Sequence, residues 1–137
     1  TLDATRIEIL NSAKEIIIAN PLVGTGSGSF PIIYEFQTGF WKGHSHNLFT
    51  EFAISHGIPS TILFLIFLIY IIYISFAKIF KGSENNINDK ALWTASFIFL
   101  LSQMIDIQYF DGRISLIFWL FLASLKCIAE EKNIELK

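Results

Sequence analysis

The chain has 137 residues, of which 53% are hydrophobic and 16% are charged, with a formal net charge of −2. Soluble domains are about 45–50% apolar, so this composition favours a membrane protein. The charge balance offers no basic patch for nucleic acid, and the single cysteine, Cys127, excludes an intramolecular disulfide.

The charged residues gather at residues 1–15, 78–90 and 126–137 and are sparse between these stretches. This distribution is typical of a polytopic helical membrane protein, so the expected fold class is all-α. No positively charged segment leads into a short apolar core at the start, so we expect no signal peptide there. The chain is expected to be the C-terminal part of a longer membrane protein whose earlier helices precede it.

The first expected element is an amphipathic helix over residues 3–19. Apolar residues recur there at helical spacing, at Ile9, Leu10, Ala13, Ile16 and Ile17. Asp3 is a suitable N-cap, and Asn20 followed by Pro21 is a stop signal. The segment is too charged to cross a bilayer, so it is expected to lie along a membrane surface or against other helices.

Residues 21–43 are expected to form a loop that is rich in glycine and then in aromatic residues. Gly24, Gly26 and Gly28 permit positive φ angles and let backbone N–H groups approach a phosphate closely. The alternative is a flexible turn. A P-loop is excluded, because no Gly-Lys-Ser/Thr sequence follows. The aromatic side chains suit the headgroup layer of a bilayer.

The segment Gly43–Glu51 brings two imidazoles, an amide and a carboxylate to the foot of a long apolar run. His44 and His46 are suited to proton transfer near neutral pH, which indicates chemistry at a membrane surface. The alternative is that these polar side chains only cap a helix or bind lipid headgroups. A short helix over residues 47–56 is expected to end at Gly57.

Three membrane spans are expected. The first runs over residues 59–80, about 22 residues or about 33 Å of helix, which is enough to cross the hydrocarbon core. The second, residues 91–105, and the third, residues 114–128, are short for a full crossing and are expected to be tilted or partly re-entrant. Asp106 follows the second span. A carboxyl group at membrane depth indicates function, but we favour the interpretation that Asp106 marks the interface.

Lysines flank the linker 81–90 and follow the third span, so the positive-inside rule assigns this loop and the C-terminus to the cytoplasm. An odd number of spans then assigns residues 1–58 to the extracytoplasmic face, with residues 59–137 as the transmembrane region. ATP and nucleotide sugars are not normally available on that face. Transfer chemistry there needs a donor that is already activated and membrane-bound.

The ordered motifs resemble the C-terminal part of the O-antigen ligase / O-antigen polymerase (Wzy-type) superfamily. That family has an arginine on the leading helix, an N-P-x-x-G-x-G-x-x-F loop, and an H-x-H-N segment before a helix ending in G-I. The matching residues, over residues 1–60, are Arg6, Asn20–Phe30, His44–Glu51 and His56–Ile58. The chain departs from the family at Leu10, where an aromatic residue often stands, and at Ser55–Gly57, where E-x-G is common.

The resemblance implies a metal-independent glycosyltransferase in the bacterial inner membrane, with no cofactor and with its active site facing the periplasm. Its donor is a glycan on undecaprenyl diphosphate, and its acceptor is a sugar hydroxyl such as that of lipid A–core. His46, followed by Asn47 in the family's H-N pair, is the expected base, and His44 is the second choice. Arg6 and the N–H groups of the glycine loop are expected to bind the diphosphate, and Asn47 is also expected to bind substrate.

Other functions stay open at this point. A polymerase of the same superfamily shares the motifs and differs in its acceptor. A transporter or channel would use Asp106 and the histidines to line an ion path, and a non-catalytic membrane subunit would use the aromatic faces only for packing. As an enzyme, this chain is expected to be inactive without the spans that precede it.

Overall fold

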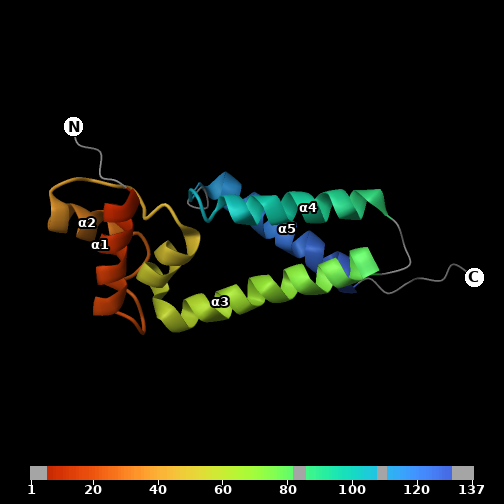
Figure 1. Ribbon diagram of the computed structural model, residues 1–137, viewed down its shortest axis with the longest axis horizontal. Helices are drawn as coiled ribbons and strands as arrows, with labels where there is room; N and C mark the ends of the chain where they lie inside the picture. The colour runs from red at the N-terminus through yellow and green to blue at the C-terminus, as the bar shows by residue number, and fades with distance from the viewer. Residues whose placement is uncertain (1–5, 82–85, 108–110, 131–137) are drawn as a thin grey trace, which may run out of the picture. The chain divides into compact units, whose positions relative to one another are not determined.

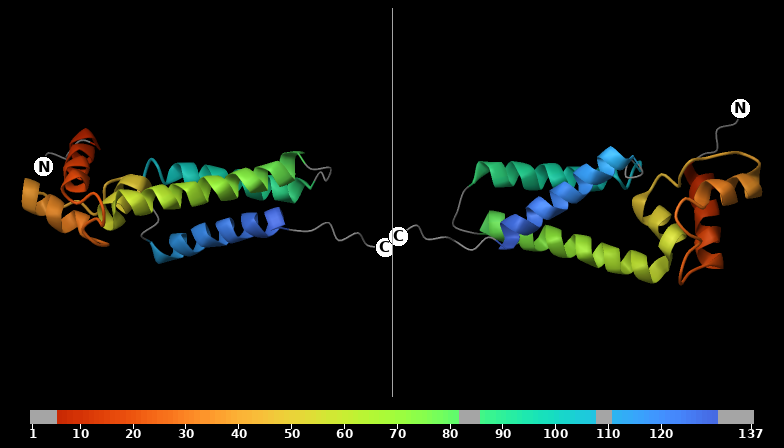
Figure 2. Two further views of the ribbon diagram at one scale, coloured as in Figure 1. Left: turned by 90° about the horizontal axis from the view of Figure 1, so that it is seen from below. Right: turned by 180° about the vertical axis from the view of Figure 1, so that it is seen from behind.

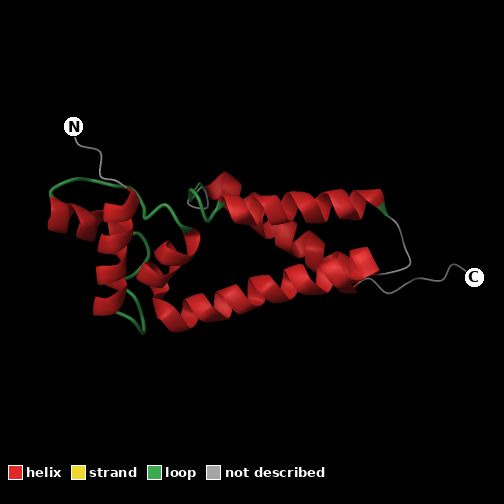
Figure 3. Ribbon diagram, viewed as in Figure 1, coloured by secondary structure: helices red, strands yellow, loops and turns green. Residues whose placement is uncertain are grey.

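The structure is a computed structural model that describes residues 6–81, 86–107 and 111–130 (Figure 1). The helices of this part are α1 (Arg6–Ala19), α2 (Phe30–Thr38), α3 (Leu48–Lys81), α4 (Ile87–Ser102) and α5 (Gly112–Glu130). Loops connect them, and the described part of the chain contains no strand (Figure 3). The all-α prediction is therefore confirmed for these residues. The N-cap predicted at Asp3 lies outside them.

The chain divides into two compact units, which are described separately. The first consists of residues 1–65 and 102–108, and the second of residues 66–101 and 109–137. Helix α3 contributes its first half to one unit and its second half to the other.

The core of the first unit lies between α1, α2 and the start of α3. Its buried side chains are Ile9, Ala13, Ile16, Phe30, Tyr34 and Ile54. The three from α1 are spaced four and three residues apart, so they share one face of the helix, as predicted. Leu10 was predicted for the same face but is 45% exposed. The helix ends at Ala19, as the Asn20–Pro21 signal predicted.

The prediction of a loop over residues 21–43 is wrong for its middle part, because α2 occupies Phe30–Thr38. Pro31 stands in the first turn, where its missing N–H has no helical partner to lose. Gly39 ends the helix in the left-handed conformation, and its N–H donates to the Glu35 carbonyl at 2.8 Å. Phe30 and Tyr34 lie one turn apart and bury their rings, which are 5.4 Å apart, against α1.

Helix α3 is bent at Gly57, whose φ of 82° and ψ of 169° are not helical. The predicted end of a short helix at Gly57 and start of a longer one at Pro59 are thus confirmed, although the ribbon is continuous (Figure 1). Proline has no N–H to donate and tolerates the first turn of a helix. The segment before the bend belongs to the candidate site, and the segment after it is the long apolar run.

The second unit contains the second half of α3 together with α4 and α5, and the chain runs along α4 in the direction opposite to α3 and α5 (Figure 2). Trp93 on α4 donates its Nε1–H to the Ile72 carbonyl of α3 at 3.3 Å. The Phe76 and Trp93 rings lie 5.3 Å apart, and Phe99 packs edge to face on Phe121 of α5 at 5.6 Å. Aromatic packing therefore joins the three helices.

Two of the described helices are long and apolar enough to cross a membrane. They are α3, with 34 residues and a mean hydropathy of 2.5, and α5, with 19 residues and a mean hydropathy of 1.6. Three spans were predicted, but the structure supports only two candidates among the described residues. The second span was predicted over residues 91–105, but the helix in this region, α4, ends at Ser102. Its 16 residues have a length of about 24 Å, which is less than the ~30 Å thickness of the hydrocarbon core.

Candidate functional site

Asn47 joins the start of α3 to the segment that follows α4. Its Oδ1 accepts the backbone N–H groups of Phe49 and Thr50 at 3.0 and 3.1 Å, which makes it the N-cap of α3. Its Nδ2 donates to the Met104 carbonyl at 3.0 Å. The Leu48 N–H donates to the Gln103 carbonyl at 3.0 Å. Asn47 was predicted to bind substrate, whereas both polar atoms of its side chain are used within the fold.

These contacts bring His46 to Asp106. The His46 Nδ1 lies 3.0 Å from Asp106 Oδ1, although 60 positions separate the two residues. The hydrogen bond from His46 holds the pKa of the Asp106 carboxyl below its usual range. An ionised carboxylate can only accept, so His46 Nδ1 carries the proton and its Nε2 is the basic nitrogen. Asp106, predicted to mark only an interface, is therefore a member of the site.

The backbone at His46 is unusual. Its φ is 58°, and no other non-glycine residue in the described part of the chain has a positive φ. This conformation is disfavoured for side chains with a Cβ and tends to occur where the surrounding structure enforces it, often at functional sites. Here the His46 side chain bonds to Asp106, and the side chain of the next residue, Asn47, bonds to the Met104 carbonyl.

His44 lies beside His46, with ring centroids 4.6 Å apart and the rings nearly perpendicular at 74°. Its Nδ1 is buried without a hydrogen-bond partner among the described residues. Burial, and secondly the neighbouring His46, lower the pKa of His44 from its ordinary value of 6.5. His44 is therefore neutral at pH 7.

Glu51 positions the loop that carries both histidines. Its side chain is only 2% exposed, and its Oε2 accepts the Ser45 N–H at 2.9 Å. Ser45 itself is 1% exposed and stands between His44 and His46 in the chain. The carboxylate of the sequence motif thus fixes the backbone between the two imidazoles.

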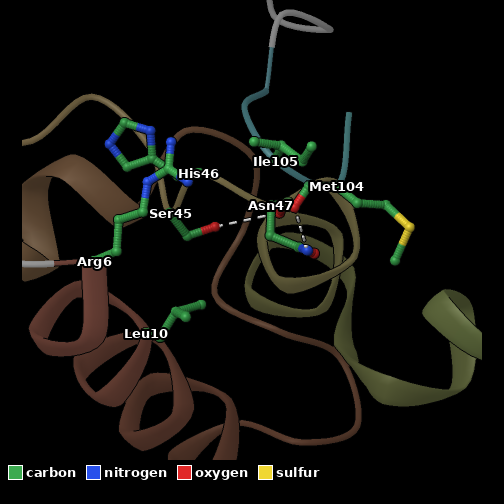
Figure 4. Close-up of a pocket in the computed structure, with 7 residues that line it drawn as sticks. All are labelled: Arg6, Leu10, Ser45, His46, Asn47, Met104 and Ile105. Carbon is green, nitrogen blue, oxygen red and sulfur yellow. Dashed lines mark hydrogen bonds between the residues drawn. The ribbon is translucent and has the colours of Figure 1, made fainter. Parts of the chain in front are cut away.

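A pocket of about 190 Å³ lies within the first unit. It is lined by Arg6, Leu10, Ser45, His46, Asn47, Met104 and Ile105. Figure 4 shows Arg6 and His46 on one side of this pocket and Met104 on the other. Three predicted site residues, Arg6, His46 and Asn47, thus share one pocket. His44 and the three loop glycines do not line it.

The glycine loop has a structural role that the sequence did not indicate. The N–H groups of Gly24 and Gly26 donate to the carbonyls of Asn20 and Ser55, each at 3.1 Å. The sequence predicted that these two N–H groups bind a phosphate. In the structure both are used within the fold and are not free to do so. Gly28 adopts a φ of 74° in open space, away from the pocket.

His44, His46 and Asp106 also form a possible metal-binding set. Their ligand atoms all lie within 4.8 Å of one another, and two imidazoles with one carboxylate are ligands that Zn²⁺ accepts. The same groups form a proton-transfer pair, because His46 and Asp106 are already at hydrogen-bond distance. The prediction of a metal-free site therefore stays a prediction, which chelation can test.

Comparison with known proteins does not identify a family or a relative of this chain. No protein-family model, curated protein or solved structure matches the chain. The functional interpretation therefore rests on the order of the sequence motifs and on the contacts of the pocket.

Proposed function

We propose that this chain is the C-terminal part of a membrane glycosyltransferase of the O-antigen ligase type. It transfers a glycan from undecaprenyl diphosphate to a sugar hydroxyl of lipid A–core. The observation that supports this function best is the meeting of Arg6 and the Asp106-bound His46 at one pocket. One side chain is suited to bind the leaving diphosphate, and the other is suited to take the proton of the acceptor.

The proposed reaction needs no group beyond these side chains. The acceptor hydroxyl loses its proton to His46 Nε2 as its oxygen attacks the anomeric carbon of the donor sugar. The bond from that carbon to the diphosphate oxygen breaks, and its electron pair leaves with undecaprenyl diphosphate. Asp106 stabilises the imidazolium that forms, as the carboxylate does in a Ser-His-Asp triad. Arg6 stabilises the charge of the leaving group through paired N–H donors.

The remaining lining of the pocket fits a lipid-linked diphosphate. Leu10, Met104 and Ile105 are apolar and lie around the same opening as Arg6. A cation beside apolar side chains matches a charged group that is attached to a hydrocarbon chain. The lengths and hydropathies of α3 and α5 support a membrane location. The bacterial inner membrane and a pocket that faces the periplasm are part of the proposal, motivated by the lysine distribution of the sequence.

The first prediction concerns topology. Ser27 lies before α3 and Asn86 after it, and both are exposed. If α3 crosses the membrane once, the two positions lie on opposite sides. In a Cys127→Ala background, an impermeant thiol reagent should label Ser27→Cys in intact cells but not Asn86→Cys. Labelling of position 86 and not of position 27 would reverse the orientation and remove the proposed periplasmic site.

The second prediction tests the activity itself, in the full-length protein with a lipid-linked glycan donor and lipid A–core. Arg6→Lys keeps the charge but loses the planar fork, so it should lose much of the transfer rate, and Arg6→Ala should lose more. Transfer should persist in EDTA, because side chains neutralise the diphosphate.

Lys14 provides the matched control for this experiment. It is an exposed cation on the same helix and does not line the pocket, so Lys14→Ala should leave transfer unchanged. Normal transfer by Arg6→Ala would contradict the assigned role of Arg6. Transfer that EDTA abolishes and Zn²⁺, Mg²⁺ or Mn²⁺ restores would contradict the metal-independent mechanism. A polymerase of the same superfamily would instead extend a second lipid-linked glycan and ignore lipid A–core.

A further inference from the structure

The turn after α1 is hydrogen-bonded to the bend in α3. The Ile58 N–H donates to the Pro21 carbonyl at 2.8 Å, and the Thr25 N–H donates to the Ile54 carbonyl at 2.7 Å. Figure 1 shows this turn beside the bend. Residues 21–25 therefore keep a fixed position next to the point where the apolar half of α3 begins.

Two glycines bring the backbones into direct contact. A Cβ on Gly24 would lie 2.5 Å from the Ile54 oxygen, and a Cβ on Gly57 would lie 2.3 Å from the Leu22 oxygen. Both glycines have positive φ angles, of 69° and 82°. The absence of both side chains lets the turn pack on the bend at backbone distance, so the two move together.

This well-held turn presents two large apolar side chains to its surroundings. Leu22 is 72% exposed and Val23 is 79% exposed. On the α3 side of the contact, Ile58 is 41% exposed and Leu63, one turn into the apolar run, is 68% exposed. The sequence from Ile16 to Tyr34 contains no charged residue. Exposed apolar side chains therefore lie both on the segment of α3 that follows the bend and on the turn bonded to it.

We propose that Leu22 and Val23 enter the bilayer in the leaflet where α3 enters it, and form a second anchor for the first unit. This inference rests on the proposed membrane crossing of α3. The occupant is lipid because the backbone contact holds the two side chains at the level of Pro59, where the apolar run begins. Two anchors, unlike one, fix the tilt of the unit. They hold the pocket at the depth where a diphosphate on a lipid chain is found.

The test is a depth measurement on the full-length protein in vesicles of phosphatidylethanolamine and phosphatidylglycerol. Nitroxide labels are placed in a Cys127→Ala background at Val23→Cys, Leu63→Cys and Ser27→Cys, one at a time. Leu63 is the lipid reference in α3, and Ser27, four residues from Val23 and exposed, is the water reference. Collision with oxygen reports lipid, and collision with a water-soluble nickel chelate reports water.

The label at position 23 should resemble that at position 63, with high oxygen and low nickel accessibility, and position 27 should show the reverse. If position 23 behaves like position 27 while position 63 is in lipid, the anchor is wrong and the membrane crossing stands. If position 63 is also in water, the crossing of α3 and the anchor are both wrong. One further outcome also overturns insertion. It is an intermediate accessibility of the label at position 23 that does not change with the acyl-chain length of the vesicles, while the accessibility at position 63 does change.

Discussion

His46→Ala in the full-length protein is expected to lower the rate of glycan transfer by about 10²–10⁴, the usual contribution of a general base. The loss follows from the geometry of the site, because the Asp106 carboxylate holds His46 Nδ1 at 3.0 Å and leaves Nε2 to accept the hydroxyl proton. The rate is measured with a labelled lipid-linked donor in membranes that contain equal amounts of each variant.

A second substitution separates catalysis from folding. His46 has a φ of 58°, and alanine is strained in this region, whereas asparagine tolerates it. His46→Asn should therefore keep the fold and still lose transfer. His56→Ala is the matched control, because His56 is the remaining histidine of the chain and packs at a tilt against Phe52, with the ring centroids 4.6 Å apart, outside the pocket. Near-normal transfer by His46→Asn would assign the base to His44.

Asp106→Asn gives a graded version of the same prediction. An amide keeps the size of the side chain but can no longer stabilise the imidazolium, and it can bind the wrong tautomer of His46. We expect a smaller loss than for His46→Ala, with kcat affected more than KM, since Asp106 does not line the pocket. Combining the two substitutions should lower the rate no further than His46→Ala alone, because both remove the same proton acceptor.

Local patterns in the sequence were sufficient for the helices whose signals lie within them. The spacing of Ile9, Ala13 and Ile16 predicted the buried face of α1, and Asn20–Pro21 predicted its end. Gly57 and Pro59 predicted the interruption of α3. Such signals work because caps, breaks and amphipathic faces depend on residues a few positions apart.

The members of the site that the sequence misplaced depend on distant contacts. Asp106 reaches His46 only because the segment after α4 bonds to Asn47 and Leu48, and no periodicity encodes that pairing. The loop glycines resembled a phosphate cradle, since a glycine that allows close backbone packing and one that admits a ligand have the same sequence signature. Helix α2 was not predicted because a helix of nine residues is too short to show a clear periodic pattern. Pro31 and Gly39 nevertheless mark its two ends.

Among the glycines that the structure describes, Gly57 is expected to cause the largest loss of stability when it is replaced by alanine. Its φ of 82° and ψ of 169° fall in a region that is essentially restricted to glycine, where strain is of order 1–3 kcal/mol. An added Cβ would also meet the backbone of Leu22, at 2.3 Å from its oxygen and 2.5 Å from its carbonyl carbon. Backbone cannot rotate aside as a flexible side chain can, so the turn would have to leave the bend and lose the Ile58 to Pro21 hydrogen bond.

Gly28→Ala is the control that isolates the contact from the backbone conformation. Gly28 also has a positive φ, of 74°, but an added Cβ would meet open space, so only the conformational penalty of about 1–2 kcal/mol remains. Thermal unfolding of the purified full-length variants in detergent should show a larger drop in Tm for Gly57→Ala than for Gly28→Ala. Gly57→Ala should also lower transfer, because pocket residues 45–47 directly precede the short segment of α3 that ends at the Gly57 bend. Equal drops in Tm would mean that moving the turn away from the bend costs little free energy. The backbone contact between them would then not fix the position of the first unit at the membrane.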